Sequence, residues 1–223
     1  VQHYLPWSKA GAADNELVFV SGHPGRTSRL YTVAELEYLR DYRLPYALQR
    51  LQSLEVLLTA YSARSEENAR RAKDELFGAQ NSRKAYVGEL AGILDPGLMV
   101  RKKAAEQKLR DGAGRDAKLK ETLPAWDRIA QAQKIVAEHA RIYNLLEAGH
   151  AFNSELFHIG RTLLRAAAER PKPNAERLRE FGEAGRESLE FQLFSEQPIY
   201  DDFEQLKLAD SLTWMAGQVG SGN

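Results

Sequence analysis

The sequence contains no cysteine, so disulfide bonds and cysteine-based metal sites are excluded. It also lacks net charge, because 31 Lys and Arg residues balance 31 Asp and Glu residues. A neutral chain has no long-range attraction for nucleic acid or for an anionic membrane surface, and we expect neither partner. No run of about 18 apolar residues is present, so no segment is predicted to span a bilayer.

Two further absences concern the start of the chain. Residues 1–5 show no basic region followed by an apolar core, so no signal peptide is expected there, and no initiator Met precedes them. We therefore expect the 223 residues to be a fragment or a processed product.

Convincing strand signals are scarce, and the one stretch that reads as a strand followed by a turn is residues 17–20, Leu-Val-Phe-Val. This apolar run, rich in β-branched and aromatic residues, predicts a short buried strand. Ser21-Gly-His-Pro-Gly25 would end it, because glycine permits positive φ and proline fixes φ. A lone hairpin is not stable in water, so this β-segment needs further structure to rest on.

Everything after Thr32 has the spacing of helices. Thr32 and Glu35 have the spacing of a capping box, which predicts a helix start. Pro45 is expected to kink or restart that helix. An apolar stripe from Tyr46 through Leu58 and Tyr61 continues more weakly to Leu94. A single helix over residues 46–94 would be roughly 70 Å long, which indicates an antiparallel coiled-coil arm.

Asp95-Pro-Gly97 is expected to stop this arm, and shorter helices to follow it. Apolar spacing and breakers predict them over residues 98–109, 115–122, 125–147, 152–164, 174–193 and 201–215. The helix over residues 125–147 is expected to return antiparallel to the long arm. The sequence thus predicts a mainly α protein, a helical bundle with long antiparallel helices and a short N-terminal β-segment.

Two Glu-x-x-His pairs are the candidate metal ligands, Glu147 with His150 and Glu155 with His158. This spacing places carboxylate and imidazole on one helix face, as in carboxylate-bridged di-iron bundles. Such bundles need the pairs on different helices, whereas these lie around the break at Gly149. We expect half-buried histidines at a helix junction, and no metal.

Other polar groups have structural explanations as well. Ser21 and His23 are adjacent turn residues and lack the geometry of a nucleophile and its base. The turn glycines do not match a phosphate loop. Asp201, Asp202 and Glu204 fit the start of a helix better than a metal site.

Several blocks of sequence closely resemble one family of enzymes. They are residues 18–30 with the Gly-His-Pro-Gly-Arg-Thr block, residues 3–8, 32–38 and 81–84, Tyr200-Asp-Asp-Phe203, and Leu208-Ala-Asp-Ser-Leu212. Along nearly its whole length the chain resembles the serine dipeptidyl aminopeptidases of bacterial periplasms, the dipeptidyl-peptidase seven and eleven group.

The resemblance implies a chymotrypsin-like double β-barrel that carries a Ser/His/Asp triad, with a helical domain inserted between its halves. Residues 1–31 would match the end of the first barrel half, and residues 32–223 the helical cap. The triad would lie outside this chain, so no catalytic residue is assigned. A helical-domain asparagine of the family helps to bind the substrate's α-amino group, and its position matches Asn81.

We therefore expect the cap domain of a periplasmic serine-type dipeptidyl aminopeptidase, inactive alone and without a cofactor. Its partners would be the N-terminus of a peptide substrate and the remainder of the catalytic domain. Two alternatives stay open: a helical interaction module that contacts a partner or a second copy, and a carboxylate-bridged metal bundle.

Overall fold

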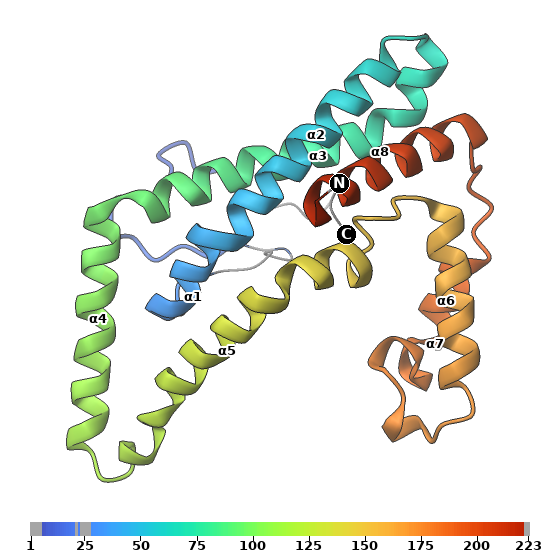
Figure 1. Cartoon of the computed structure of the whole chain (residues 1–223). Helices are drawn as coiled ribbons and strands as arrows, with labels where there is room; N and C mark the ends of the chain where they lie inside the picture. The colour runs from blue at the N-terminus through green and yellow to red at the C-terminus, as the bar shows by residue number, and fades with distance from the viewer. Residues whose placement is uncertain (1–5, 21, 23–27, 221–223) are drawn as a thin grey trace. The chain divides into compact units, whose positions relative to one another are not determined.

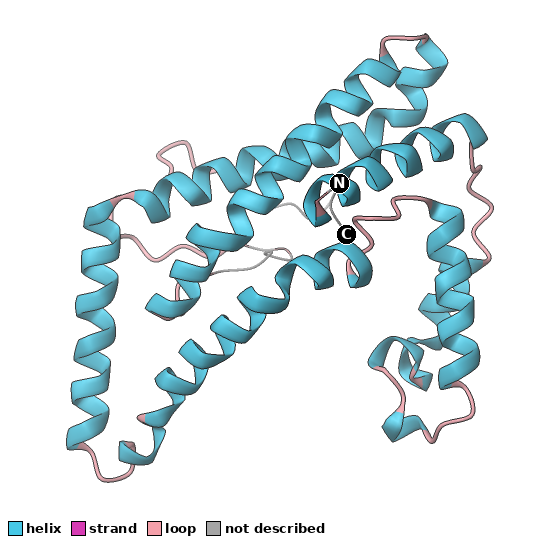
Figure 2. Cartoon of the chain, in the orientation of Figure 1, coloured by secondary structure: helices cyan, strands magenta, loops and turns pink. Residues whose placement is uncertain are grey.

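The computed structural model describes residues 6–20, 22 and 28–220, which form two units, residues 1–31 and residues 32–223 (Figure 1). Helices and connecting loops make up the described residues, and no strand occurs among them (Figure 2). The mainly α fold class is thereby confirmed.

In the first unit, the Glu16 amide donates to Ala13 O at 3.1 Å and closes a turn. Leu17 to Val20 carry no strand pairing and are exposed. Gly22 has φ +132°, a value that favours glycine. Ser21 and residues 23–27, including His23, lie outside the described residues, so the β-segment stays a prediction.

In the second unit, local signals place the first helices. Helix α1 (Val33–Tyr38) begins with the predicted capping box, in which the Thr32 amide donates to Glu35 Oε2 at 2.7 Å. Pro45 lies in the first turn of helix α2 (Leu44–Ser62), directly after a π-helical turn over Leu39–Arg43. The restart predicted at this proline is confirmed.

The single long helix predicted over residues 46–94 is wrong. Helix α2 ends at Ser62 and helix α3 (Glu66–Leu94) turns back along it, so that the two form a hairpin (Figure 1). The break occurs at Ser65, whose side chain accepts from the Asn68 amide at 3.1 Å and caps α3. The return on α2 is therefore made by α3 and not by residues 125–147.

Helices α4 (Pro96–Arg115) and α5 (Pro124–Ile142) follow, the latter continued by a π-helical turn over Tyr143–Glu147. Asp95 caps α4 as its side chain accepts from the Gly97 amide at 2.9 Å. The end predicted for this helix at residue 109 is wrong, because α4 continues through Gly112 and Gly114 to Arg115. Ala113 is buried there and a Cβ at Gly114 would lie 3.9 Å from Leu123, so tertiary packing outweighs glycine's weak helix propensity.

Helices α6 (Glu155–Glu169), α7 (Arg186–Leu193) and α8 (Asp201–Val219) complete the chain. The helix predicted over residues 174–193 is present only as α7. Three short 3₁₀ turns occupy Asn174–Glu176, Arg179–Phe181 and Glu183–Gly185. The Asn174 side chain accepts from the Glu183 amide at 2.9 Å, an interaction that competes with helix formation.

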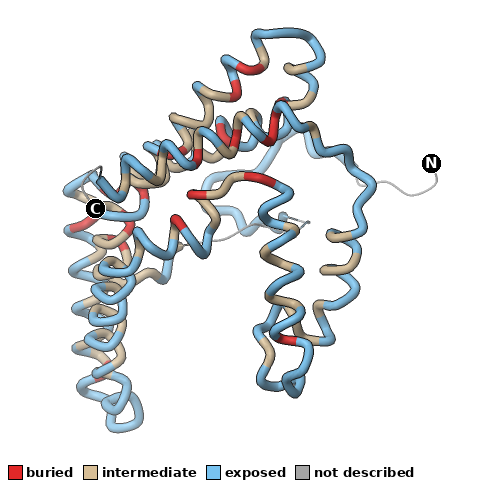
Figure 3. The backbone as a smooth tube through the Cα atoms, turned by 45° about the vertical axis from the view of Figure 1, so that its right-hand side comes forward, coloured by how far each residue is buried: buried red, intermediate tan, exposed pale blue. Residues whose placement is uncertain are grey.

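A core cluster lies where α8 meets the α2–α3 hairpin. It contains Leu58, Tyr61, Ala72 and Phe203, with the Tyr61 and Phe203 rings 4.7 Å apart. Elsewhere most residues are exposed or half-buried, as the tube in Figure 3 shows. Helix α6 buries only Glu169, although its sequence has an apolar face.

Replacement of Phe203, which is 5% exposed, should therefore destabilise the unit strongly. We expect F203A to lower the free energy of unfolding by about 3–5 kcal/mol, because it removes a buried ring and leaves a cavity. Phe191 is 83% exposed and provides the matched control. Urea denaturation should show F191A within about 0.5 kcal/mol of wild type, and equal losses in both variants would contradict this core.

Candidate functional site

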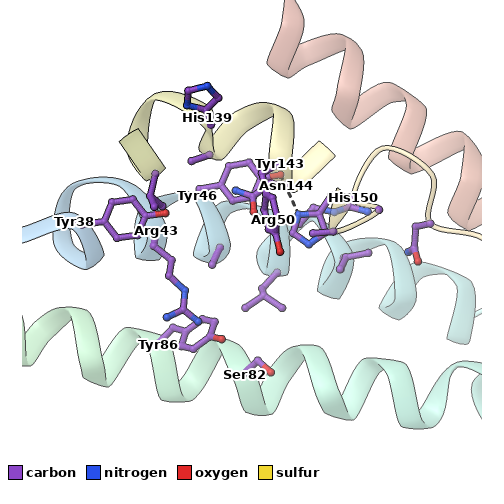
Figure 4. Close-up of a pocket in the computed structure, with 18 of the residues that line it drawn as sticks. Tyr38, Arg43, Tyr46, Arg50, Ser82, Tyr86, His139, Tyr143, Asn144 and His150 are labelled. Carbon is purple, nitrogen blue, oxygen red and sulfur yellow. Dashed lines mark hydrogen bonds between the residues drawn. The ribbon is translucent and has the colours of Figure 1, made fainter. Parts of the chain in front are cut away.

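A cavity of about 770 Å³ lies among α2, α3, α5 and the segment over residues 148–153 (Figure 4). Its polar lining includes Arg43 just before α2, Tyr46 and Arg50 of α2, Ser82 of α3, and Asn144 and His150 after α5. Leu51, Leu54, Ile135 and Val136 contribute apolar walls. The second unit thus contains a pocket of the size and mixed lining typical of small-molecule sites.

Tyr46 is the centre of a hydrogen-bond chain at one side of this cavity. Trp214 of α8 donates its indole N–H to Tyr46 Oη at 3.3 Å, and Tyr46 Oη lies 3.0 Å from His150 Nδ1. Since the indole can only donate, the tyrosine hydroxyl is free to give its proton to His150 Nδ1. Burial raises the pKa of Tyr46, which keeps the phenol protonated and able to donate.

His150 is neutral in this arrangement. Burial lowers its pKa, and the positive charge of Arg50 lowers it further. With Nδ1 accepting from Tyr46, the proton of the neutral ring sits on Nε2. In this tautomer His150 offers an N–H donor at Nε2, and protonation of Nδ1 would reverse the direction of its hydrogen bond with Tyr46.

Arg50 and Asp210 form a buried ion pair beside the cavity. Arg50 is only 4% exposed, and its Nη1 lies 2.6 Å from Asp210 Oδ2 of α8. The same guanidinium lies 5.4 Å from the centre of the Trp214 ring. Charge pairing and stacking thus hold α8 against α2 next to the Tyr46 hydrogen-bond chain.

A second charge cluster, buried at Lys207 and Glu204, joins α3, α6 and α8. Lys207 Nζ lies 2.9 Å from Glu75 and 3.0 Å from Glu204. Glu204 also accepts from the Glu155 amide and so caps α6 from another helix. Burial alone would raise the pKa of Glu204, but the hydrogen bonds from Lys207 and Ser154 lower it, so the carboxylate stays charged.

The acidic residues predicted to begin a helix do lie in the first turn of α8. Asp202 has a further role, since it accepts from Tyr61 Oη at 2.8 Å and pairs with Arg71. Ser211 accepts from the Asn153 amide at 3.0 Å. The blocks over residues 200–203 and 208–212 therefore contribute contacts that fix α8 on its neighbours.

Asn81 lies in α3 and is exposed. Its neighbour Ser82 lines the cavity, but Asn81 does not. Asn81 makes no side-chain hydrogen bond to the residues that the structure describes. No contact in this chain tests its predicted role, so that role stays a prediction.

The two Glu-x-x-His pairs do not converge. Glu147 is bound by Arg161 and Arg165, and His150 by Tyr46. His158 is exposed rather than half-buried as expected, whereas His150 is half-buried. Among the described residues, no three His, Cys, Asp or Glu side chains are placed to hold a metal ion.

Sequence reasoning missed the cavity residues Tyr46 and Arg50, and Trp214 which contacts both, as a group. One signal was available, because Tyr46 and Arg50 are four apart and must share a helix face. A charged residue on the otherwise apolar stripe of α2 indicates a buried partner. Nothing in the spacing, however, identifies that partner as Asp210, 160 residues further on.

These features define a helical unit in which charged residues hold the helices together and line a pocket. Comparison of the sequence with known protein families shows the family to which it belongs. The peptidase S46 family matches residues 1–223, and the chain belongs to this family. The predicted resemblance to dipeptidyl peptidases is thereby confirmed.

One curated relative is the Asp/Glu-specific dipeptidyl-peptidase of Shewanella putrefaciens (strain CN-32 / ATCC BAA-453). It is 26% identical over 193 residues, which cover 86% of this chain and 25% of the relative. The chain thus spans about a quarter of the length of this relative. No solved structure matches the chain, and in the described part of the chain no helix has the length and apolarity to cross a membrane.

The neutral state of His150 predicts a pH dependence of stability. Its pKa in the folded chain lies below the ordinary value of 6.5, so the unfolded chain binds more protons between these two values. The free energy of unfolding should therefore fall as the pH drops through about 6.5, by at most about 1.4 kcal/mol per pH unit for one group.

Urea denaturation of H150Q between about pH 5 and 7 should show a shallower pH dependence than wild type, because glutamine does not titrate in this range. Exposed His158 provides the control, and H158Q should keep the wild-type slope. Identical slopes in wild type and H150Q would show that the buried imidazole does not stabilise the fold in its neutral form.

Proposed function

We propose that this chain is the helical cap lobe of a serine-type dipeptidyl aminopeptidase of the bacterial periplasm. In this proposal the Ser/His/Asp triad lies in other parts of a longer enzyme. The cap covers the active-site cleft and helps to restrict cleavage to dipeptides at free N-termini. The family match and the dipeptidyl-peptidase relative support the proposal.

The main structural support for this proposal is the exposed side chain of Asn81. Its side-chain amide is exposed and makes no hydrogen bond to the described residues. Residues three before, four after and seven after it share its helix face. These are Gly78, Ala85 and Gly88, and a Cβ built at either glycine would meet no atom within 4 Å.

This face of α3 leaves room for a peptide backbone to approach Asn81 closely. A substrate's α-ammonium has only donors, and an amide oxygen can accept from it without adding a charge. Asn81 is therefore suited to bind a free N-terminus, while the acyl-transfer chemistry takes place on residues outside this chain.

In the full-length enzyme, N81A should lower kcat/KM for a fluorogenic dipeptide substrate by about tenfold to a hundredfold, the effect of one hydrogen bond to a charged group. We choose a substrate with an acidic second residue, because the relative is named as an Asp/Glu-specific dipeptidyl-peptidase. Q131A, which removes an exposed amide on α5, should leave kcat/KM unchanged. An N81A enzyme with wild-type kcat/KM would refute the role of Asn81.

The 223-residue chain alone should not release dipeptides from the same substrate. The expected rate is that of buffer, because the proposal places the nucleophile and its base elsewhere. Turnover that a serine-directed inhibitor abolishes would overturn the assignment as a cap lobe.

Exposed apolar side chains support a second candidate, a helical module that binds a partner or a second copy. On α6, Leu163 is 54% and Leu164 74% exposed, and Phe194 after α7 is 79% exposed. A stable dimer in light scattering would favour this function, and a monomer would favour a lobe covered by its own enzyme.

A further inference from the structure

The cavity among α2, α3 and α5 has an uneven charge. Two arginines, Arg43 and Arg50, line it together with His139 and His150, and within the described part of the chain no Asp or Glu does. Asp210 pairs with Arg50 from outside this lining, so the unbalanced positive charge is that of Arg43. A pocket with this lining favours an anion over a neutral or cationic guest.

Arg43 is the cation that is left without a counter-charge. Its guanidinium is exposed and lies 6.0 Å from the centre of the Tyr86 ring, with which it lines one side of the cavity (Figure 4). It forms no ion pair with any residue that the structure describes. Arg50, in contrast, is already paired with Asp210.

His150 supplies a donor of a different kind on the other side. Its Nδ1 shares a hydrogen bond with Tyr46 Oη, which accepts from Trp214. In the tautomer whose Nδ1 accepts from Tyr46, the neutral ring carries an Nε2–H that suits a carbonyl or carboxylate oxygen. Between the two polar sides lie Leu51, Leu54, Ile135 and Val136, and both Ile135 and Val136 are exposed.

We propose that this cavity binds a small organic carboxylate, its anionic group on Arg43, its apolar body between α2 and α5, and an oxygen acceptor at His150. A volume of about 770 Å³ is sufficient for a molecule of several hundred daltons. The site is independent of the proposed role of Asn81. Asn81 lies about 140° around α3 from Tyr86, at 3.6 residues per turn.

The test compares N-acetyl-leucine with its neutral analogue N-acetyl-leucinamide, titrated into the 223-residue chain by calorimetry. The acid should bind with a Kd below about 1 mM, and the amide at least tenfold more weakly. R43Q should weaken binding of the acid about tenfold and leave the amide unchanged, and R43K should restore part of the loss. Equal binding of acid and amide would overturn the proposal, as would no binding of the acid.

Arg64 provides a matched control, because it is also exposed and stacks 5.6 Å from the centre of a tyrosine ring, that of Tyr61. R64Q should bind the acid as wild type does. A47F fills the cavity without changing a charge and should abolish binding. If A47F binds normally, or if R64Q weakens the acid as much as R43Q does, the carboxylate sits elsewhere and the site is refuted.

The indole N–H signals of the three tryptophans give the location in the folded chain. Trp214 donates to Tyr46, which lines the cavity, and its signal should shift when the acid binds, whereas that of Trp126, whose ring lies beside Arg110, should not. A shift of the Trp126 signal with none at Trp214 would contradict the assigned site.

Discussion

The buried pair of Arg50 and Asp210 is the constraint on which the candidate pocket depends. A guanidinium at 4% exposure is costly to bury unless a carboxylate meets it, and Asp210 does so from a helix 160 residues away. Once α8 is held by this contact, Trp214 lies against Arg50 and reaches Tyr46. The Tyr46 hydroxyl in turn forms a hydrogen bond with His150. One ion pair thus helps to position side chains from α2, from α8 and from the segment over residues 148–153.

The fold was predictable where its cause lies within a few residues. The Thr32–Glu35 box and the Pro45 restart depend on backbone groups next to them, and the sequence predicts both. The turn between α2 and α3 was missed because its signal, Ser65 as a cap, stands inside an apolar pattern that continues across it. The 3₁₀ turns after α6 were missed because Asn174 captures the Glu183 amide, a contact no helical period reveals.

The candidate site residues were likewise hard to predict where their partners are far away in the sequence. Asn81 comes from the family resemblance alone, since an exposed helical asparagine has no pattern of its own. Tyr46 and His150 are 104 residues apart, and no spacing rule joins them. The blocks at residues 200–203 and 208–212, which carry part of the resemblance, fix α8 through Asp202, Asp210 and Ser211. Part of the family signature in this chain therefore records how the helices are held together.

What the helical unit has in excess is apolar surface rather than charge. Several of its arginines and lysines are paired with carboxylates, among them the buried Lys207 between Glu75 and Glu204. Helix α6, by contrast, leaves Leu163 and Leu164 exposed and buries only a carboxylate, Glu169. Burying such side chains contributes about 25 cal/mol per Å² of apolar surface, whereas surface ion pairs contribute little. Contact between this face and another body would therefore stabilise the unit in a way that its own helices do not. In the proposed enzyme, where the unit is the cap lobe, the remainder of the catalytic domain would make that contact.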